Sequence, residues 1–443
     1  MFGPGNKSQG LLYLASASAA ALTMAFLATP AGAAPQYTFK LLHAFCKFKQ
    51  CTDGSGPNGS LLLDPAGEVF GATSGGGKYH KGLVFKLAPE GKRYTESILH
   101  NFCNASCSDG PNPAGDLVAD KNGVLYGVAG FCDGPNRGGT IFSLTHGSKS
   151  WSLKVLHTFT NAEYVCHGLA YEGQESGAPW DGASPLFGVA SSGGAYQNGY
   201  VFELKPSGWA FADIHDFQES SGPNLPVVDA TGNVFGTNAY GGKYQGGLLY
   251  KLAAGTWKEA TLRNFCSEGG ACANGNHPVG QPVIDAGGNL YTATAEGGLQ
   301  NDACIDSNNA TCGVVFERTA GGAYKVLYEF CSLANCADGG NPLSGLTIDE
   351  AGNLFGATDL GGAARHCPDD WGCGVAFRLI NNGNSSWSET VLHSFCNWDN
   401  CGDGSNPEAS LAIDGAGDIF GTAAMAGEHG SGDNGGTVFE LKL

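Results

Sequence analysis

Short runs of alternating apolar and polar residues recur along the chain in three patterns that keep a fixed order. The first is an apolar run, a tight turn and an apolar-aromatic-glycine run, as in residues 346–356. The second is a Val-Phe-x-Leu-like run, as in residues 375–379, and the third is a Leu-His-x-Phe-like run, as in residues 392–395. Each pattern occurs seven times, and alternation with a period of two is typical of half-buried β-strands. The patterns therefore predict an all-β repeat protein.

Each repeat predicts four strands, which we name A to D. The first pattern supplies strands A and B, joined by an Asp-x-x-Gly turn in which the carboxylate caps the turn and the glycine tolerates positive φ. The second and third patterns supply strands C and D. An isolated four-stranded sheet exposes both faces, whereas blades stacked around an axis bury them. Seven such units predict a seven-bladed β-propeller.

The order of the strands at the two ends predicts how the ring closes. A D-type run at Tyr37–Phe45 comes first, and the A, B and C runs of the last unit lie within residues 407–443. Pairing the first strand with the last three would complete the seventh blade and remove two open sheet edges. We therefore expect a closed ring.

Composition agrees with an all-β propeller, and the net charge restricts the classes of partner that the protein can bind. The chain of 443 residues contains 71 glycines and only 14% charged residues, and no helical periodicity follows residue 34. Its formal net charge is −18. A surface of this sign repels phosphate backbones and anionic membranes, so we expect no nucleic-acid partner.

Residues 1–34 have the features of an export signal. Lys7 precedes an apolar, alanine-rich stretch from Leu11 to Leu27, and residues 31–33 supply a small-residue cleavage pattern. A membrane anchor is the alternative, but the stretch is short and contains serines, and no later run is long enough to span a membrane. We expect residues 35–443 to form one propeller, secreted as a monomer into the periplasm or the extracellular space, without a cofactor.

Sixteen cysteines agree with an oxidising compartment. In the predicted propeller, the B–C loops and the D-to-A links lie on one face, which we call the link face, and all sixteen cysteines fall on it. The predicted bridges are Cys46–Cys51, Cys103–Cys107, Cys132–Cys166, Cys266–Cys272, Cys304–Cys312, Cys331–Cys336, Cys367–Cys373 and Cys396–Cys401. Zinc is the alternative, but it needs four converging ligands and these pairs are dispersed around the ring.

Three motifs connect the chain with a known family. They are Asp-x-x-Gly-Asn-Leu-Phe-Gly-Ala-Thr at 349–358, Gly-Gly-Lys-Tyr at 241–244 and Gly-Thr-Val-Phe-Glu-Leu at 436–441. With these motifs, residues 37–443 resemble exported bacterial proteins of the Gloeobacter–Verrucomicrobia ("GloVer") tandem-repeat family. The resemblance implies a propeller-like fold and export. Members often carry varied C-terminal anchors; this sequence shows none, so we expect release from the cell.

Recurring polar residues are interpreted as structural. The histidine of strand D recurs in five repeats, whereas a catalytic histidine is needed once; its copies are His43, His100, His157, His215 and His393. Aspartates precede glycine in four links, near the expected mouth of the central channel; these are Asp53, Asp109, Asp338 and Asp403. A ring of carboxylates there could bind calcium through oxygen ligands, although turn geometry also accounts for the Asp-Gly pairs.

Residues that depart from the repeat are the candidate ligand-binding residues. The B–C loop of the sixth repeat is enlarged and contains aromatic, basic and acidic side chains, and other loops of the link face present further aromatics. The candidates are Arg365, Asp370, Trp371, Trp398, Tyr79, Tyr196 and Tyr244. Aromatics beside acids on rigid loops suit a carbohydrate or a peptide, and ordinary solvent-exposed loops are the alternative.

Two classes of function remain. A secreted binding module would hold a glycan, a peptide or a cell-envelope partner on the link face. An extracellular propeller glycosidase or lyase acting on polysaccharide would need an acid/base pair across the substrate, which the sequence neighbours Asp369 and Asp370 do not by themselves provide. Motifs for a serine triad, a zinc protease or a phosphate loop are absent from the sequence. We favour the binding module.

Overall fold

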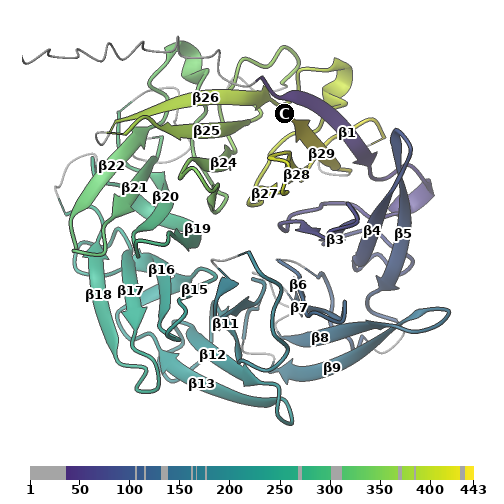
Figure 1. The fold of residues 1–443 in the computed structure, drawn as a ribbon, viewed down its shortest axis with the longest axis horizontal. Helices are drawn as coiled ribbons and strands as arrows, with labels where there is room; N and C mark the ends of the chain where they lie inside the picture. Colours follow the sequence, from purple (N-terminus) through teal and green to yellow (C-terminus); the bar gives the residue numbers. More distant parts are fainter. Residues whose placement is uncertain are drawn as a thin grey trace, which may run out of the picture. The chain divides into compact units, whose positions relative to one another are not determined.

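The alternating runs pair into seven antiparallel sheets, which stand as blades around one axis within residues 37–443 (Figure 1). The structure is a computed structural model, and it describes residues 36–104, 107–113, 116–130, 138–160, 163–165, 167–174, 177–267, 272–300, 312–367, 372–383, 386–429 and 435–443. The prediction of a seven-bladed, all-β propeller is confirmed. No helix among the described residues is long and apolar enough to cross a membrane.

Each blade runs from a short inner strand A to a long outer strand D. Strand A is only two residues long in most blades. Blade 4 has an additional strand, β14 (Ser220–Pro223), which pairs with β16. From strand A to strand D, the blades are β2 (Leu62–Leu63), β3 (Val69–Thr73), β4 (Leu83–Glu90), β5 (Arg93–Asn101); β6 (Val118–Ala119), β7 (Leu125–Gly130), β8 (Gly139–His146), β9 (Trp151–Phe159); β10 (Ala170–Tyr171), β11 (Leu186–Ala190), β12 (Tyr200–Lys205), β13 (Ala210–Asp216); β15 (Val227–Val228), β16 (Val234–Gly241), β17 (Leu248–Leu252), β18 (Glu259–Asn264); β19 (Asn276–Ile284), β20 (Leu290–Glu296), β21 (Val314–Arg318), β22 (Tyr324–Glu329); β23 (Thr347–Ile348), β24 (Leu354–Thr358), β25 (Val375–Asn381), β26 (Trp387–Ser394); and β27 (Ala412–Ile413), β28 (Ile419–Ala423), β29 (Thr437–Lys442), β1 (Thr38–Ala44).

The first strand closes the ring, as predicted. β1 pairs antiparallel with β29, with Thr38 opposite Lys442 and Ala44 opposite Thr437. The seventh blade therefore has the order β1-β29-β28-β27, and it unites the two ends of the propeller in one sheet (Figure 1). The β1–β29 pairing joins residues about 400 positions apart in the sequence, and the Lys40 ammonium, opposite Glu440, also donates a hydrogen bond to the Glu440 carboxylate.

Neighbouring blades are joined by a repeated aromatic contact. The phenylalanine that ends each strand D packs against an aromatic ring of strand C in the next blade, with ring centroids 5.0–5.5 Å apart. The pairs are Phe45 with Phe85, Phe102 with Phe142, Phe159 with Phe202, Phe217 with Tyr250, Phe265 with Phe316, Phe330 with Phe377 and Phe395 with Phe439. The rings are tilted or edge-to-face, the arrangement favoured by their quadrupoles.

A β-bulge recurs in the outer strand of every blade. In blade 1, Val84 pairs with His100 and the next residue, Phe85, pairs with Ile98, so Leu99 is the extra residue. In the other six blades, the pairing of strand C with strand D shows a register shift at the equivalent position. A bulge redirects the side chains that follow it.

The recurring histidine position faces the outer strand of the next blade. Its side chain pairs there with an acid or stacks on an aromatic ring, which gives it the predicted packing role. The contacts are His43 with Glu96, His157 with Phe211, His215 with Glu259, Arg263 with Tyr324 and His393 with Phe39. Burial raises the pKa of Glu96 to about 8 and lowers that of His43 to about 4, so both groups are neutral between these values.

Replacing Gly71 by Ala is expected to destabilise the ring. An added Cβ would lie 2.6 Å from Cζ of Phe85 and 2.9 Å from a methyl of Leu61, and both side chains are buried. Overpacking of this kind costs roughly 1–3 kcal/mol, measurable by denaturant unfolding. The control is Gly415→Ala, where a Cβ meets no atom within 4 Å and which should change stability little. Equal effects at both sites would contradict the packing argument.

Stability is expected to fall as pH rises from about 4.5 to about 8. Burial raises the folded-state pKa of both Glu96 and Glu389 to about 8, far above the unfolded value, so unfolding releases their protons and this stability is lost as pH rises through 8. Each group contributes at most about 1.4 kcal/mol per pH unit. The double variant Glu96→Gln/Glu389→Gln should flatten the curve of unfolding free energy between pH 4.5 and 8. A curve as steep as that of the wild type would overturn the assignment.

Candidate functional site

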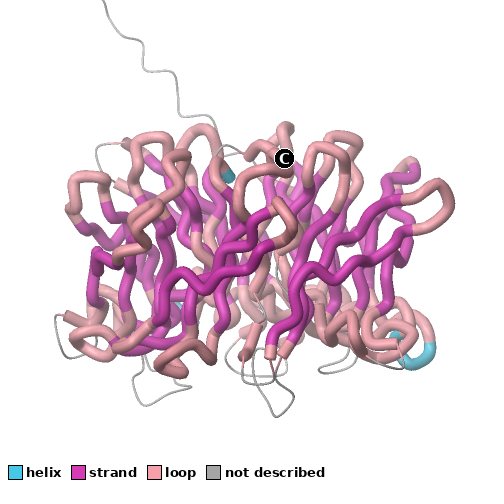
Figure 2. The backbone as a smooth tube through the Cα atoms, turned by 90° about the horizontal axis from the view of Figure 1, so that it is seen from below, coloured by secondary structure: helices cyan, strands magenta, loops and turns pink. Residues whose placement is uncertain are grey.

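The described part of the link face is built from junctions in which a D-to-A link lies against the B–C loop of the next blade. A backbone hydrogen bond connects the two segments, donated by a glycine N–H of the B–C loop to a carbonyl of the link. The described examples are Gly77 to Cys51, Gly242 to Glu219, Gly298 to Cys272, Gly362 to Cys336 and Gly427 to Cys401, at 2.9–3.3 Å. Loops gather at the two ends of the strands (Figure 2), and the junctions occupy one of these ends. The sequence predicted the face but not the pairing of its loops.

Four of the five described disulfide-closed links contain a buried aspartate that contacts the link from inside, and buried Asn274 takes its place in the Cys266–Cys272 link. Asp403 is fully buried, and its carboxylate accepts the backbone N–H groups of Asn397 and Trp398, both at 3.1 Å, and contacts His393 Nε2 at 2.8 Å. Asp338 makes the same backbone contacts in the preceding link, where Tyr328 replaces the histidine. These aspartates therefore hold the links in shape.

Three links use this frame to present an apolar side chain to solvent. Phe48, Leu333 and Trp398 each stand two residues after the first cysteine and immediately before a 3-10 helix, in the same extended conformation. The helices are η1 (Lys49–Cys51), η4 (Ala334–Cys336) and η5 (Asp399–Cys401). The three side chains are 56%, 52% and 39% exposed. Sequence analysis identified Trp398 and missed the other two, although their spacing from the cysteine is the same.

The three predicted tyrosines are also exposed, each on a B–C loop. Tyr79, Tyr196 and Tyr244 follow a glycine pair, and their exposed fractions range from 38% to 51%. The loop backbone beside each tyrosine is held by the last residue of strand D: Asn101 accepts the N–H of Lys78, and Asn264 accepts that of Lys243. These tyrosines lie on blades 1, 3 and 4, so they do not share one cluster with Trp398.

The enlarged loop of blade 6 bends onto the next link. His366 donates its backbone N–H to the carbonyl of Cys396, and its Nε2 lies 3.3 Å from Asp399. Arg365, its neighbour in sequence, is therefore close to the link that presents Trp398, whose ring packs edge-on against Phe39 at 5.4 Å. The other two predicted residues of this loop, Asp370 and Trp371, lie outside the described residues.

Disulfide bonds close the links and one B–C loop as predicted. The bonds described are Cys46–Cys51, Cys103–Cys107, Cys266–Cys272, Cys331–Cys336, Cys367–Cys373 and Cys396–Cys401. Cys312 is also disulfide-bonded, and its predicted partner Cys304 lies outside the described residues, as do Cys132 and Cys166. No described cysteine is free.

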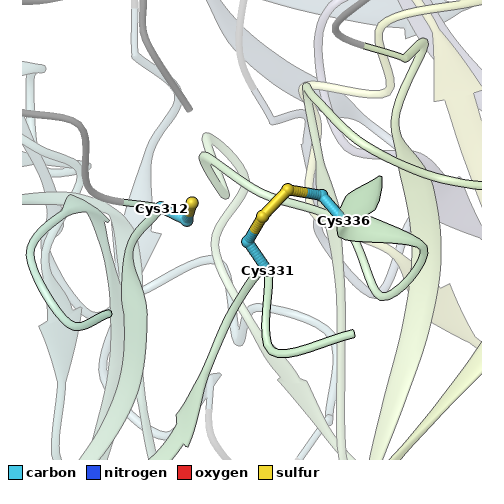
Figure 3. A group of neighbouring side chains, drawn as sticks. All are labelled: Cys312, Cys331 and Cys336. Atoms are coloured by element: carbon cyan, nitrogen blue, oxygen red, sulfur yellow. A yellow bond between two sulfur atoms is a disulfide. The ribbon is translucent and has the colours of Figure 1, made fainter. Parts of the chain in front are cut away.

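Two groups of three cysteine sulfurs, which sequence analysis treated as dispersed, converge within 4.8 Å. Cys312 lies beside the Cys331–Cys336 bond (Figure 3), and Cys373 lies beside the Cys396–Cys401 bond. Among the described residues these are the groups compact enough to share one ion, and neither includes a link aspartate. The calcium hypothesis for Asp53, Asp109, Asp338 and Asp403 therefore gains no support from their positions, because these carboxylates contact their own loops.

The inner strands enclose a cavity of about 710 Å³ on the propeller axis. Leu, Val and Ile side chains of strand A form much of its wall. Three aspartates also line it, and each carboxylate accepts backbone N–H groups: Asp64 from its own turn, Asp120 from its own turn, and Asp116 from Ser60. The four link aspartates are not among the residues that line this cavity.

A comparison with known protein families identifies the same repeat that the sequence analysis found. Residues 5–175 match the Gloeobacter/Verrucomicrobia repeat, and the same motifs continue around the ring to β29. Residues 5–175 therefore contain the Gloeobacter/Verrucomicrobia repeat. No curated protein is significantly similar to this chain.

Solved structures similar to this repeat protein share its fold at low identity. The extracellular domain of a proposed one-component system from B. thetaiotaomicron superposes with a TM-score of 0.53 at 12% identity; the match covers 91% of this chain and only 40% of that one. An oligogalacturonate lyase from Vibrio parahaemolyticus gives 0.53 at 9% identity, covering 92% and 97% of the two chains. An oligogalacturonate lyase in complex with manganese gives 0.51 at 10% identity, with the same coverage. At these identities the likeness shows the fold alone.

Replacing Asp403 by Ala is expected to loosen a link of this repeat protein. The change leaves the backbone N–H groups of Asn397 and Trp398, and His393, without their carboxylate acceptor, at a cost of roughly 2–4 kcal/mol of unfolding free energy. Amide exchange at Trp398 should become faster. Asp399→Ala is the control, because the Asp399 side chain is 94% exposed and, among the described residues, forms an ion pair only with His366. Unchanged exchange in Asp403→Ala would refute the anchoring role.

Proposed function

We propose that this protein is exported by residues 1–34 and acts as a binding module that holds a carbohydrate on its link face. One observation carries the proposal. Ten large apolar side chains among the described residues are exposed, and all but Ile98 and Leu443 lie on the link face: Phe48, Tyr79, Tyr196, Tyr240, Tyr244, Leu299, Leu333 and Trp398. Apolar side chains gathered on one face mark an interaction surface.

The rigidity of the loops supports the same conclusion. Disulfides, buried aspartates and the hydrogen bonds between links and B–C loops fix the backbone beneath the exposed side chains. Side chains held in place lose less conformational entropy when a ligand binds, which favours affinity. The disulfides also agree with an oxidising compartment outside the cytosol.

The arrangement of the aromatics favours a carbohydrate over a peptide. The exposed rings stand on separate junctions, spaced by small and polar loop residues, and an extended chain of sugars offers apolar ring faces between hydroxyl groups. Peptides are held mainly by a free strand edge or by an apolar groove. The loops of the link face instead bond to one another through their backbone groups.

Removing the tyrosines tests the proposal. Tyr79→Ala/Tyr196→Ala/Tyr244→Ala should weaken retention by the polysaccharides that hold the wild type by roughly tenfold or more, through lost contacts to the rings. Affinity electrophoresis in a panel of neutral and acidic polysaccharides measures this. Ile98→Ala is the control, because Ile98 is similarly exposed but lies on β5 away from the link face. Equal retention of both variants, or no retention of the wild type by any polymer, would refute the function.

A further inference from the structure

The junction between blades 7 and 1 differs from the others in charge. Its link, residues 46–54, and its B–C loop, residues 76–82, contain four of the 23 basic residues of a chain whose net charge is −18. These are Lys47, Lys49, Lys78 and Lys81, and all four are exposed. The one acid of these two segments, Asp53, is buried and accepts the N–H groups of Lys47 and Phe48. The surface of this junction is therefore positive.

The lysines and two aromatic rings stand on one fixed frame. Gly77 donates its N–H to the carbonyl of Cys51 at 2.9 Å, which ties the B–C loop to the link. Asn101 accepts the N–H of Lys78 at 2.7 Å. Exposed Phe48 and Tyr79 lie between the lysines, and Nζ of Lys78 is 5.2 Å from the centre of the Tyr79 ring. Ammonium groups and aromatic rings thus form one surface, which we call the basic aromatic patch.

The neighbouring junction, between blades 6 and 7, has the opposite charge. Its link presents Trp398 and the exposed Asp399, and its B–C loop presents Glu428. Residues 396–404 and 425–429 contain neither lysine nor arginine, and the basic residue near this link is Arg365 of the blade 6 B–C loop. The link face therefore has adjoining positive and negative sectors rather than a uniform charge.

We infer that the basic aromatic patch binds an acidic polysaccharide, with sugar rings against Phe48 and Tyr79 and carboxylates paired to Lys47, Lys49 and Lys78. This inference rests on the proposed function and adds the class of ligand. Charge complementarity carries it, because the two loops offer Lys47, Lys49 and Lys78 no exposed acid. At physiological salt the field of a charge extends about 8 Å, so the patch acts locally despite the negative surface elsewhere.

Other anionic macromolecules fit the patch less well. A membrane surface is planar and would also meet the acidic sector with Asp399 and Glu428, which it repels. Double-stranded DNA carries one charge per roughly 1.7 Å and suffers the full repulsion of the net negative protein. A polyuronate carries one charge per sugar, is narrow enough to contact one junction, and offers ring faces to the aromatics.

Polygalacturonate and its fully methyl-esterified form test the inference, because they share a backbone and differ in charge. The wild-type protein should bind polygalacturonate, lose binding as salt increases, and bind the ester at least roughly tenfold more weakly. Lys47→Gln/Lys49→Gln/Lys78→Gln should weaken polygalacturonate binding about tenfold, the combined effect of three surface ion pairs. Lys92→Gln/Lys149→Gln/Lys258→Gln changes the net charge equally on turns between strands C and D and should leave binding unchanged.

The outcomes separate this inference from the proposed function. Equal binding of both polymers, or equal loss in the two lysine variants, overturns the inference while leaving carbohydrate binding in place. Binding of phosphatidylcholine vesicles with 30% phosphatidylglycerol, or of duplex DNA, more tightly than polygalacturonate also overturns it. Retention by neutral polysaccharides alone overturns the acidic ligand class. Retention by no polysaccharide overturns both.

Discussion

The contact between the last phenylalanine of strand D and the strand C ring of the next blade is the constraint on which the rest of the structure depends. It recurs at all seven interfaces, and its rings are among the most buried side chains of the protein. The strand C ring also lies over a strand B glycine, as Phe85 does over Gly71, which explains why the aromatic residue of strand B is followed by glycine in most repeats. One aromatic pair thus sets the distance between blades and the sequence of the strand beneath it.

This core contact also positions the link face. In five repeats the cysteine that opens the link follows the buried phenylalanine directly, as Cys396 follows Phe395. The disulfide and the buried Asp403 then determine the path of the next few residues, and Trp398 emerges at a fixed place and angle. The same frame carries Phe48 and Leu333 in two other links. Constant residues hold the loop, and the residues between them are free to differ from blade to blade.

Ionisable groups also differ between the constant, buried positions and the variable, exposed loop positions. Buried ionisable groups between outer strands, such as Glu96 and His43, are neutral near pH 6 because burial disfavours their charged forms. The charged residues that differ between junctions stand on the exposed loops instead, where water and ligands reach them. A ring of similar junctions can therefore present a basic aromatic patch beside an acidic one without any change in the fold. This is consistent with a scaffold whose specificity resides in its loops.

The sequence by itself determined the number of blades, the four-strand unit, the closure through β1 and the bonding of the described cysteine pairs, because these follow from local periodicity and spacing that recur seven times. It did not determine the shift at the Leu99 bulge, the pairing of links with B–C loops, or the convergence of Cys373 on the Cys396–Cys401 bond. These features join segments from different strands and blades, so no local pattern encodes them. The same holds for the basic aromatic patch: Lys47 and Lys78 are 31 positions apart, and their loops are brought together by backbone hydrogen bonds, such as those between Gly77 and Cys51 and between Ser55 and Gly75. Exposure, too, was decided by the tertiary structure, because Phe48 has the composition of a core residue and reaches solvent only through the conformation that Asp53 imposes on its link.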